Sequence, residues 1–419
     1  MSRVRLPGNR TLRVRIAVSF VNRLLDSMVT SFMAIYLASA FGAASAGLLI
    51  FAVVGLGVLA MLVGGHIADK HGRKRTLLLA EAGMAASFAV MAVAVAASRT
   101  PALLVYGGYL VNRLAASMAL PASDAMIVDV TTPQTRKQAY AVNYWAVNLA
   151  LATGSLLGAW LYVGHFTAML TGAAVCATGV LLTTVFLIRE TRPATTTVAA
   201  TPHEFFSGYR AVLRDRRFVR FTAAATLTLA IEFQLVNYVG VRLASDMPPQ
   251  DLFPAAGLTV HVTGVQMLGL LRAENTVLVV LLALFSRRLF RRLPDRFALY
   301  FGVALFVGGY LVLAVSNTGW LLMVAGFVYT VGELMNVPVK QALLADMVPD
   351  TARTRYLAAY NLNIRFAQIV AALFITIGSV VPPYGMAVLY AVIGVAIVMQ
   401  YRSVLAPPRP AERMEEHTG

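Results

Sequence analysis

The sequence predicts an all-α membrane protein, with twelve transmembrane helices arranged as two pseudo-symmetric six-helix bundles. Apolar residues make up 58% of the 419 residues, charged residues only 13%, and the mean hydropathy is +0.71. A soluble domain carries about 25% charged residues, so this composition excludes an ordinary soluble fold. Predominantly apolar runs of about 18 or more residues recur along the whole chain, and each can cross a bilayer as a helix.

Cations are placed unevenly along the chain. Most of the 35 Lys and Arg residues fall in alternate connections between apolar runs and in the two terminal segments. This bias follows the positive-inside rule, so we predict that both termini are cytoplasmic. It also explains the net charge of +16 without a nucleic-acid partner. The first apolar run begins near residue 16 and is too long for a signal-peptide core, so we expect it to be a retained span.

The predicted spans divide the chain into two halves of six. They cover 14–41, 44–68, 76–98, 102–129, 137–163, 166–189, 218–243, 266–290, 297–316, 319–346, 355–381 and 384–403. The longest cytoplasmic connection, 190–217, begins with a polar stretch that contains proline. We therefore predict an N-terminal bundle at 1–189, a cytoplasmic linker at 190–217, a C-terminal bundle at 218–403 and a cytoplasmic tail at 404–419.

A weak internal repeat supports this division. Pro121, Asp129 and Arg136 recur as Pro338, Asp346 and Arg353, each pair 217 positions apart. Chance remains an alternative, because the flanking residues share little else. Parallel halves related by an axis along the membrane normal are typical of one class of transporter, which holds its substrate near the midplane between the halves.

The stretch "GGHIADKHGRKR" at 64–75 joins the second and third spans. Its pattern of Gly65, Asp69, Gly72 and Arg73 resembles the signature loop of the major facilitator superfamily. The resemblance implies a gating role for these residues. We expect Gly65 to permit close helix packing, Gly72 to permit a tight reversal, and Asp69 to close a breakable latch between the halves by accepting from an arginine or a helix N-terminus. The alternative is a basic loop that only sets topology.

The repeated acid and arginine pairs resemble the superfamily's loops after spans four and ten. There, an acid at a helix end pairs with a nearby arginine and stiffens the cytoplasmic rim. The resemblance implies this role for Asp129 with Arg136 and for Asp346 with Arg353. Independent helix-end charges are the alternative.

Ionisable residues inside the predicted spans are candidates for proton coupling, because charges at membrane depth are costly and usually face a cavity. Asp26 in the first span and Arg113 in the fourth resemble the acid and arginine that move protons in antiporters of the superfamily; a static salt bridge is the alternative. Glu333, one turn before Pro338, and Glu232 in the seventh span are further candidates. We also expect Arg272 to pair with Glu274.

Several strings resemble the LmrP-type multidrug/proton antiporters more than the superfamily at large. They include "AMIVDVTTPQTRKQAYAVNYWAVNLALATGSLLGAWLY", "VYTVGELMNVPVKQALLAD" and "EFQLVNYVGVRLAS". The resemblance implies a substrate cavity with Asn143, Tyr144, Trp145, Gln234, Asn237 and Tyr329 in its wall. Two departures affect charge, since Asn143 and Val236 stand where that group carries acids. The usual proline of the fifth helix is also missing, because Gly154 is followed by serine.

These features predict a secondary transporter, not an enzyme, that exports lipophilic or cationic compounds in exchange for protons by alternating access. The resemblance places it in a bacterial cytoplasmic membrane, with membrane lipids as its surroundings. We expect a monomer that uses the proton gradient and needs no metal or other cofactor. The alternatives are a proton-coupled importer of a small metabolite, a lipid flippase, or a sensor that does not transport.

Overall fold

The structure, a computed structural model, describes residues 10–97, 102–191, 212–253, 260–290, 293–349 and 352–405. In this part of the chain, eleven helical segments are long and apolar enough to cross a membrane. One of them, α5 (Pro133–Leu187), contains two helices, because Val163, Gly164 and His165 have non-helical backbone angles. The break coincides with the predicted boundary between the fifth and sixth spans. The predicted twelve-helix fold is therefore confirmed.

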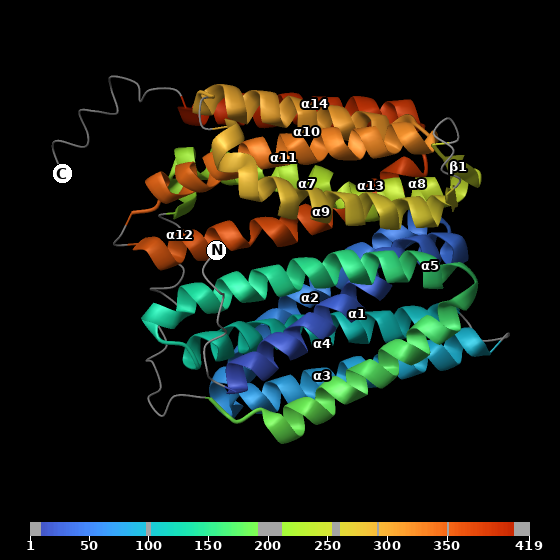
Figure 1. Cartoon of the computed structure of the whole chain (residues 1–419), viewed down its shortest axis with the longest axis vertical. Coiled ribbons are helices and arrows are strands. Elements are labelled where there is room, and N and C mark those ends of the chain that lie inside the picture. Colours follow the sequence, from blue (N-terminus) through green and yellow to red (C-terminus); the bar gives the residue numbers. More distant parts are fainter. Residues whose placement is uncertain are drawn as a thin grey trace.

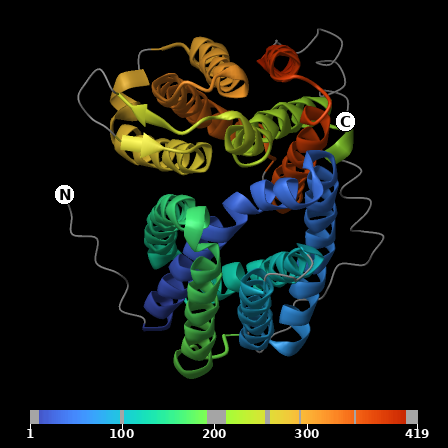
Figure 2. The ribbon, with the colours of Figure 1, turned by 90° about the vertical axis from the view of Figure 1, so that its right-hand side faces the viewer.

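The helices form two groups that lie side by side (Figures 1 and 2). The N-terminal bundle consists of α1 (Arg10–Phe41), α2 (Ala43–His71), α3 (Arg73–Ala96), α4 (Ala102–Asp129) and α5. The C-terminal bundle consists of α7 (Arg216–Glu232), η1 (Phe233–Val236), α8 (Tyr238–Asp246), α9 (Gly264–Phe290), α10 (Asp295–Val315), α11 (Gly319–Met347), α12 (Arg353–Asn361), α13 (Asn363–Gly378) and α14 (Pro383–Leu405). Most of the predicted linker, 192–211, and the tail from 406 onward lie outside the described residues.

Two spans that the sequence predicts as continuous are broken. The seventh changes from α7 to the short 3₁₀ helix η1 and resumes as α8, and the eleventh is interrupted at Leu362 between α12 and α13. At the first break, the Tyr310 hydroxyl donates to the Glu232 carbonyl at 2.9 Å. Inside a membrane, non-helical backbone persists only where protein or a cavity satisfies it. The two breaks therefore mark positions where these helices meet partners other than lipid.

A short β-hairpin is the one described departure from an all-helical chain. Strands β1 (Gln250–Leu252) and β2 (Val260–Val262) pair antiparallel, with Asp251 opposite His261. Leu252 and Val262 are buried in the core of the C-terminal bundle. The hairpin therefore packs onto that bundle, and we call the side of the molecule that carries it the hairpin end. The opposite side is called the Gly72 end.

The internal repeat corresponds to equivalent helices. Pro121 of α4 and Pro338 of α11 are 217 positions apart, and each helix continues through its proline. Each ends at or one residue after the repeated aspartate. Pro338 does not break its helix, because α11 extends through it to Met347. The shared length and proline position support pseudo-symmetric halves.

The two bundles make their closest approaches toward the hairpin end. A Cβ atom at Gly47 of α2 would lie 2.7 Å from the Thr376 backbone nitrogen of α13, and one at Gly269 of α9 would lie 2.2 Å from Ala159 Cβ of α5. The Thr376 hydroxyl also donates to the Ala44 carbonyl at 2.8 Å. Backbones this close pack without intervening side chains, as is usual at helix contacts in membranes. The structure is thus closed at the hairpin end.

We predict that Gly47→Ala destabilises this closed arrangement. The added methyl group collides with the backbone of α13, and overpacking of this kind costs about 1–3 kcal/mol. Thermal unfolding of the purified protein in detergent measures the loss. Gly55→Ala on the same helix is the matched control, because a Cβ there meets nothing within 4 Å. Equal melting temperatures for both variants would contradict the prediction.

Candidate functional site

The larger of two described cavities lies within the N-terminal bundle and is closed on one side by α12 and α13. Its volume is about 700 Å³, and its wall includes Asp26, Arg113, Glu81, Asp124 and Arg365. It extends along α1 from Asp26 to Arg15, near the Gly72 end. About half of the described wall residues are charged or polar, and Phe88 is the only aromatic residue among them. The aromatic wall expected from sequence is therefore not what lines this cavity.

A second cavity, of about 210 Å³, lies where the two bundles meet. Ser31, Tyr109 and Ser117 line it from the N-terminal bundle, and Phe233 and Asn237 line it from the broken seventh span. Asp26, Arg113, Ser117, Arg365 and Gln368 contribute to both cavities. These shared residues mark the junction between the two. A discontinuous helix beside a midplane cavity is typical of transporter binding sites.

Asp26 and Arg113 form an ion pair at this junction. Arg113 Nη1 contacts Asp26 Oδ1, and the Thr30 hydroxyl donates to the same oxygen at 3.1 Å. The two side chains are 26% and 20% exposed, so the pair is neither solvated nor sealed. A carboxylate and a guanidinium at this depth stabilise each other against the cost of desolvation. The predicted proton-coupling residues Asp26 and Arg113 are thus brought together and face open space.

Close packing by α5 fixes the segment of α1 that carries Asp26. Cβ atoms at Gly154 and Gly158 would lie 2.4 Å from the Leu24 carbonyl oxygen and 2.3 Å from that of Met28. The Ser27 hydroxyl donates to the Leu151 carbonyl at 2.8 Å. Glycines four residues apart let the two helix backbones touch, so the small-residue spacing compensates for the missing proline as far as packing is concerned.

Arg272 and Arg365 also belong to this site, although the sequence did not predict either of them as a cavity residue. Arg272 Nη1 donates to Ser31 Oγ across the bundle interface, and both arginines line the smaller cavity. The expected pair of Arg272 with Glu274 is wrong, because residues two apart on a helix point in different directions. Glu274 instead lies against Gly326 of α11. For both arginines, the available signal in the sequence is a charge inside a predicted span.

Glu333 and Glu232 lie inside the C-terminal bundle and line neither described cavity. Glu333 Oε2 accepts from Asn275 Nδ2 at 3.0 Å, which joins α11 to α9. Glu232, Glu333 and Lys340 are close enough to influence one another electrostatically. Two acids and one lysine therefore form a second charged cluster, separate from the Asp26–Arg113 pair.

The residues predicted to form the substrate wall are divided by the structure. Asn143 lines the larger cavity and Asn237 the smaller. Tyr329 is buried in the C-terminal core, where its ring packs against Tyr310 at 5.0 Å between centroids, so it is not a wall residue in this conformation. Three further assignments are corrected in the same way.

Gln234 is buried and its side-chain amide donates to the Ala230 carbonyl at 2.8 Å, which caps the turn before the break. Tyr144 and Trp145 are 58% and 44% exposed and lie away from both cavities. The sequence did not show which face of α5 points inward, because apolar residues occur all round that helix.

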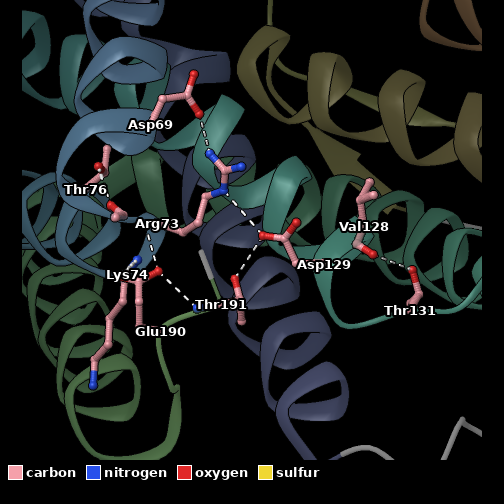
Figure 3. A network of polar contacts seen from close by, with 10 residues as sticks. Asp69, Arg73, Lys74, Thr76, Val128, Asp129, Thr131, Glu190 and Thr191 are labelled. Carbon is pink, nitrogen blue, oxygen red and sulfur yellow. Dashed lines mark hydrogen bonds and ion pairs between the residues drawn. The ribbon is translucent and has the colours of Figure 1, made fainter. Parts of the chain in front are cut away.

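A network of polar contacts occupies the Gly72 end of the N-terminal bundle (Figure 3). Arg73 Nη1 contacts Asp69 Oδ1 at 2.6 Å, and Arg73 Nε contacts Asp129 Oδ2 at 3.4 Å. The Thr191 hydroxyl also donates to Asp129 Oδ2, at 3.1 Å. These contacts all lie within one bundle. The expected latch between the halves is therefore not what Asp69 and Arg73 form in this conformation; they join α2, α3 and α4.

Glu190, which follows the second half of α5, caps α3 in the same network. Its carboxylate accepts from the backbone N–H groups of Arg73 at 2.9 Å and Lys74 at 3.1 Å. A negative charge at a helix N-terminus is stabilised by the helix dipole and satisfies free N–H groups. In the sequence, this glutamate is only the first residue of the predicted linker. Figure 3 shows it beside Thr191, facing the start of α3.

The glycines of the loop act at partly different positions from those expected. Gly72 has φ of 106°, which confirms the predicted reversal. At Gly65, an added Cβ would only make ordinary contact with Pro121 Cγ at 3.8 Å. The close approach is at its neighbour Gly64, where a Cβ would lie 2.4 Å from the Met118 carbonyl oxygen. The prediction for Gly65 is therefore wrong by one residue, which on a helix is a change of face.

The second pair of rim charges is described only in part. Asp346 is exposed near the end of α11. The side chains of Arg136 and Arg353 lie outside the described residues, so the pairs Asp129–Arg136 and Asp346–Arg353 stay predictions. For Asp129, the described ionic partner is Arg73.

The comparisons with known proteins agree with this architecture. Residues 16–260 match the Major Facilitator Superfamily. The chain is 30% identical over 377 residues to a Na(+), Li(+), K(+)/H(+) antiporter of Planococcus maritimus, covering 88% of this chain and 89% of that protein. It is 27% identical over 319 residues to the multidrug resistance protein MdtH of Yersinia enterocolitica, covering 74% of this chain and 70% of the relative. The nucleoside transporter NupG shares the fold, with a TM-score of 0.71 at 13% identity over 96% of this chain and 100% of NupG.

The fold and the paired charges at a midplane cavity define a secondary transporter rather than an enzyme. The chain belongs to the Major Facilitator Superfamily. It is a multi-pass membrane protein. The narrower resemblance to LmrP-type antiporters stays a prediction.

We predict unequal effects for the two acids that contact Arg73. Asp69 is 75% exposed and Asp129 only 13%. Exposed ion pairs contribute about 0–1 kcal/mol, whereas loss of one partner of a buried pair costs more, because the other charge is left uncompensated. Asp129→Asn should therefore lower the melting temperature of the purified protein more than Asp69→Asn does. The reverse order would show that Asp129 does not hold this network together.

Proposed function

We propose that the protein is a proton-coupled antiporter that exports cations by alternating access from a bacterial cytoplasmic membrane. The Gly72 end then faces the cytoplasm, as the distribution of cations in the sequence indicates. The observation that carries the proposal is the Asp26–Arg113 ion pair at the junction of the two cavities. Closure at the hairpin end makes this the conformation that receives cytoplasmic cargo.

Among the described residues, Asp26 is the one carboxylate that lines both cavities, and such a position suits exchange. A proton that neutralises Asp26 removes the attraction to Arg113, and a cation that binds Asp26 must also displace that guanidinium. Proton and cargo therefore cannot both occupy the carboxylate. This mutual exclusion is the physical basis of antiport, since the carrier returns with one ligand after releasing the other. Glu232 and Glu333 supply two further carboxyl groups, in the C-terminal bundle.

The lining of the larger cavity favours small hydrophilic cations as cargo. Its wall is rich in charged and amide side chains, including Asn22, Asn112 and Gln368. Such groups replace the hydration shell of an ion better than they solvate an apolar compound. The relative from Planococcus maritimus, named a Na(+), Li(+), K(+)/H(+) antiporter, supports the same class of substrate.

Export of lipophilic cations is the second candidate. A volume of about 700 Å³ accommodates a drug-sized molecule. Relatives named multidrug resistance protein MdtH support this reading at 24–29% identity. The two candidates share the coupling carboxylate and differ in the cargo.

We predict that Asp26→Asn abolishes cargo-dependent proton movement. In energised everted membrane vesicles, addition of sodium, lithium or potassium salts should dissipate the pH gradient in the wild type. The variant carries no charge at this position, so the same additions should leave the gradient as in vesicles without the protein. A lipophilic dye tested in the same vesicles distinguishes the second candidate.

Asp251→Asn is the matched control, because Asp251 is an exposed acid of the hairpin whose described ionic partner is His261. It should retain wild-type exchange. Full exchange by Asp26→Asn would contradict the proposed coupling. If neither alkali cations nor dyes dissipated the gradient in the wild type, the proposal of cation antiport itself would be wrong.

A further inference from the structure

The smaller cavity carries an excess of positive charge. Of the described residues that line it, the charged ones are Asp26, Arg113, Arg272 and Arg365. Asp26 compensates Arg113 through their ion pair. Two arginines remain, and a guanidinium does not lose its proton in a protein. The cavity therefore keeps an uncompensated positive charge in a space of about 210 Å³.

The described contacts of the two remaining arginines are neutral. Arg272 Nη1 donates to Ser31 Oγ. Arg365 Nη1 donates to Gln368 Oε1 at 3.3 Å, and its Nη2 lies 3.8 Å from Met61 Sδ. Among the described residues, neither arginine has a carboxylate within 4.0 Å. Asp26 and Glu232 act on Arg272 only at longer range.

Like charges increase the cost of this arrangement. Arg365 is close enough to Arg113 and Arg23 for their charges to repel it. Partly buried cations that repel one another are costly unless a negative charge lies among them. Each arginine also has several N–H donors, of which the described contacts use only one or two. The site thus has both the charge and the donors to hold an anion.

We propose that the smaller cavity binds a monovalent anion between Arg272 of α9 and Arg365 of α13, opposite the Asp26–Arg113 pair. The anion is either a free halide or the carboxylate group of a solute, since both present a single negative charge to guanidinium donors. A carboxylate accepts two parallel hydrogen bonds from one arginine, and a halide accepts bonds from several donors at once.

An anion in this place changes the field at Asp26. It compensates one of the two remaining positive charges, so a cation approaching Asp26 meets less repulsion. This consequence depends on the proposed cation antiport, whereas binding of the anion does not. The two ideas can therefore fail separately.

Binding is tested on the purified full-length protein in detergent, in Tris titrated with HEPES, whose bulky sulfonate is the only anion. Addition of chloride should raise the melting temperature along a saturating curve. Arg272→Gln and Arg365→Gln should each weaken the apparent affinity for chloride by about tenfold or more, because each removes a charged donor. Arg220→Gln, which removes an exposed arginine of α7, is the matched control and should bind as the wild type does.

Tris acetate in place of Tris chloride distinguishes the two sources without adding an alkali cation. Saturable stabilisation by chloride supports a free halide, and stabilisation by acetate without chloride supports a carboxylate solute. If the arginine variants fail to fold, equilibrium dialysis of the wild type against radioactive chloride or acetate measures binding directly. Absence of saturable binding by both anions, or equal binding in Arg272→Gln, Arg365→Gln and the wild type, would overturn the proposal.

Discussion

The charged centre of this molecule is stable only because Asp26 and Arg113 form an ion pair. Two full charges at membrane depth are tolerated only because each compensates the other and because a cavity gives both access to polar surroundings. The surrounding helices are arranged to keep that pair in place. Gly154 and Gly158 bring α5 onto the backbone of α1 on either side of Asp26. A larger residue at either glycine would displace the carboxylate as well as the helix.

Most of the fold could be predicted from the sequence, because hydropathy identifies each span from its own residues and the charge bias of the loops gives its orientation. The break inside α5 also had a local signal in the sequence, because position 164 is a glycine, and it adopts a positive φ in the structure. The breaks near Phe233 and Leu362 had none. No proline lies within several residues of either position, and the polar residues there (Gln234, Asn237, Asn361 and Asn363) do not by themselves end a helix. Their cause is tertiary: the Tyr310 hydroxyl satisfies the carbonyl that the first break releases, and cavities adjoin both segments.

The candidate site could be predicted only for residues whose charge is costly to place inside a membrane span, because such a charge stands out in the sequence. Asp26 and Arg113 were identifiable because an isolated charge in hydrocarbon is expensive, so a charge there implies a partner. The same reasoning identified Arg272 but assigned it the wrong partner, since sequence spacing does not include the neighbouring bundle. The prediction that Tyr329 lines the substrate cavity was wrong for a related reason. An aromatic residue in a span is equally suited to a cavity wall and to a core, and here it packs against Tyr310.

The contacts fall into two kinds, and the difference suggests how the molecule moves. The Asp26–Arg113 pair, the Gly154–Leu24 approach and the network around Arg73 all lie within the N-terminal bundle. They can persist while that bundle rotates as a rigid body. The contacts of Gly47 with α13 and of Arg272 with Ser31 cross between bundles and must break when the hairpin end opens. Ser31 lies five residues after Asp26 on α1, so departure of Arg272 withdraws a positive charge from the vicinity of that carboxylate. In the proposed antiport, opening toward the hairpin end therefore favours entry of a proton at Asp26, which displaces the exported cation, and the rigid-body movement and the chemistry of the carboxylate are coupled through one arginine.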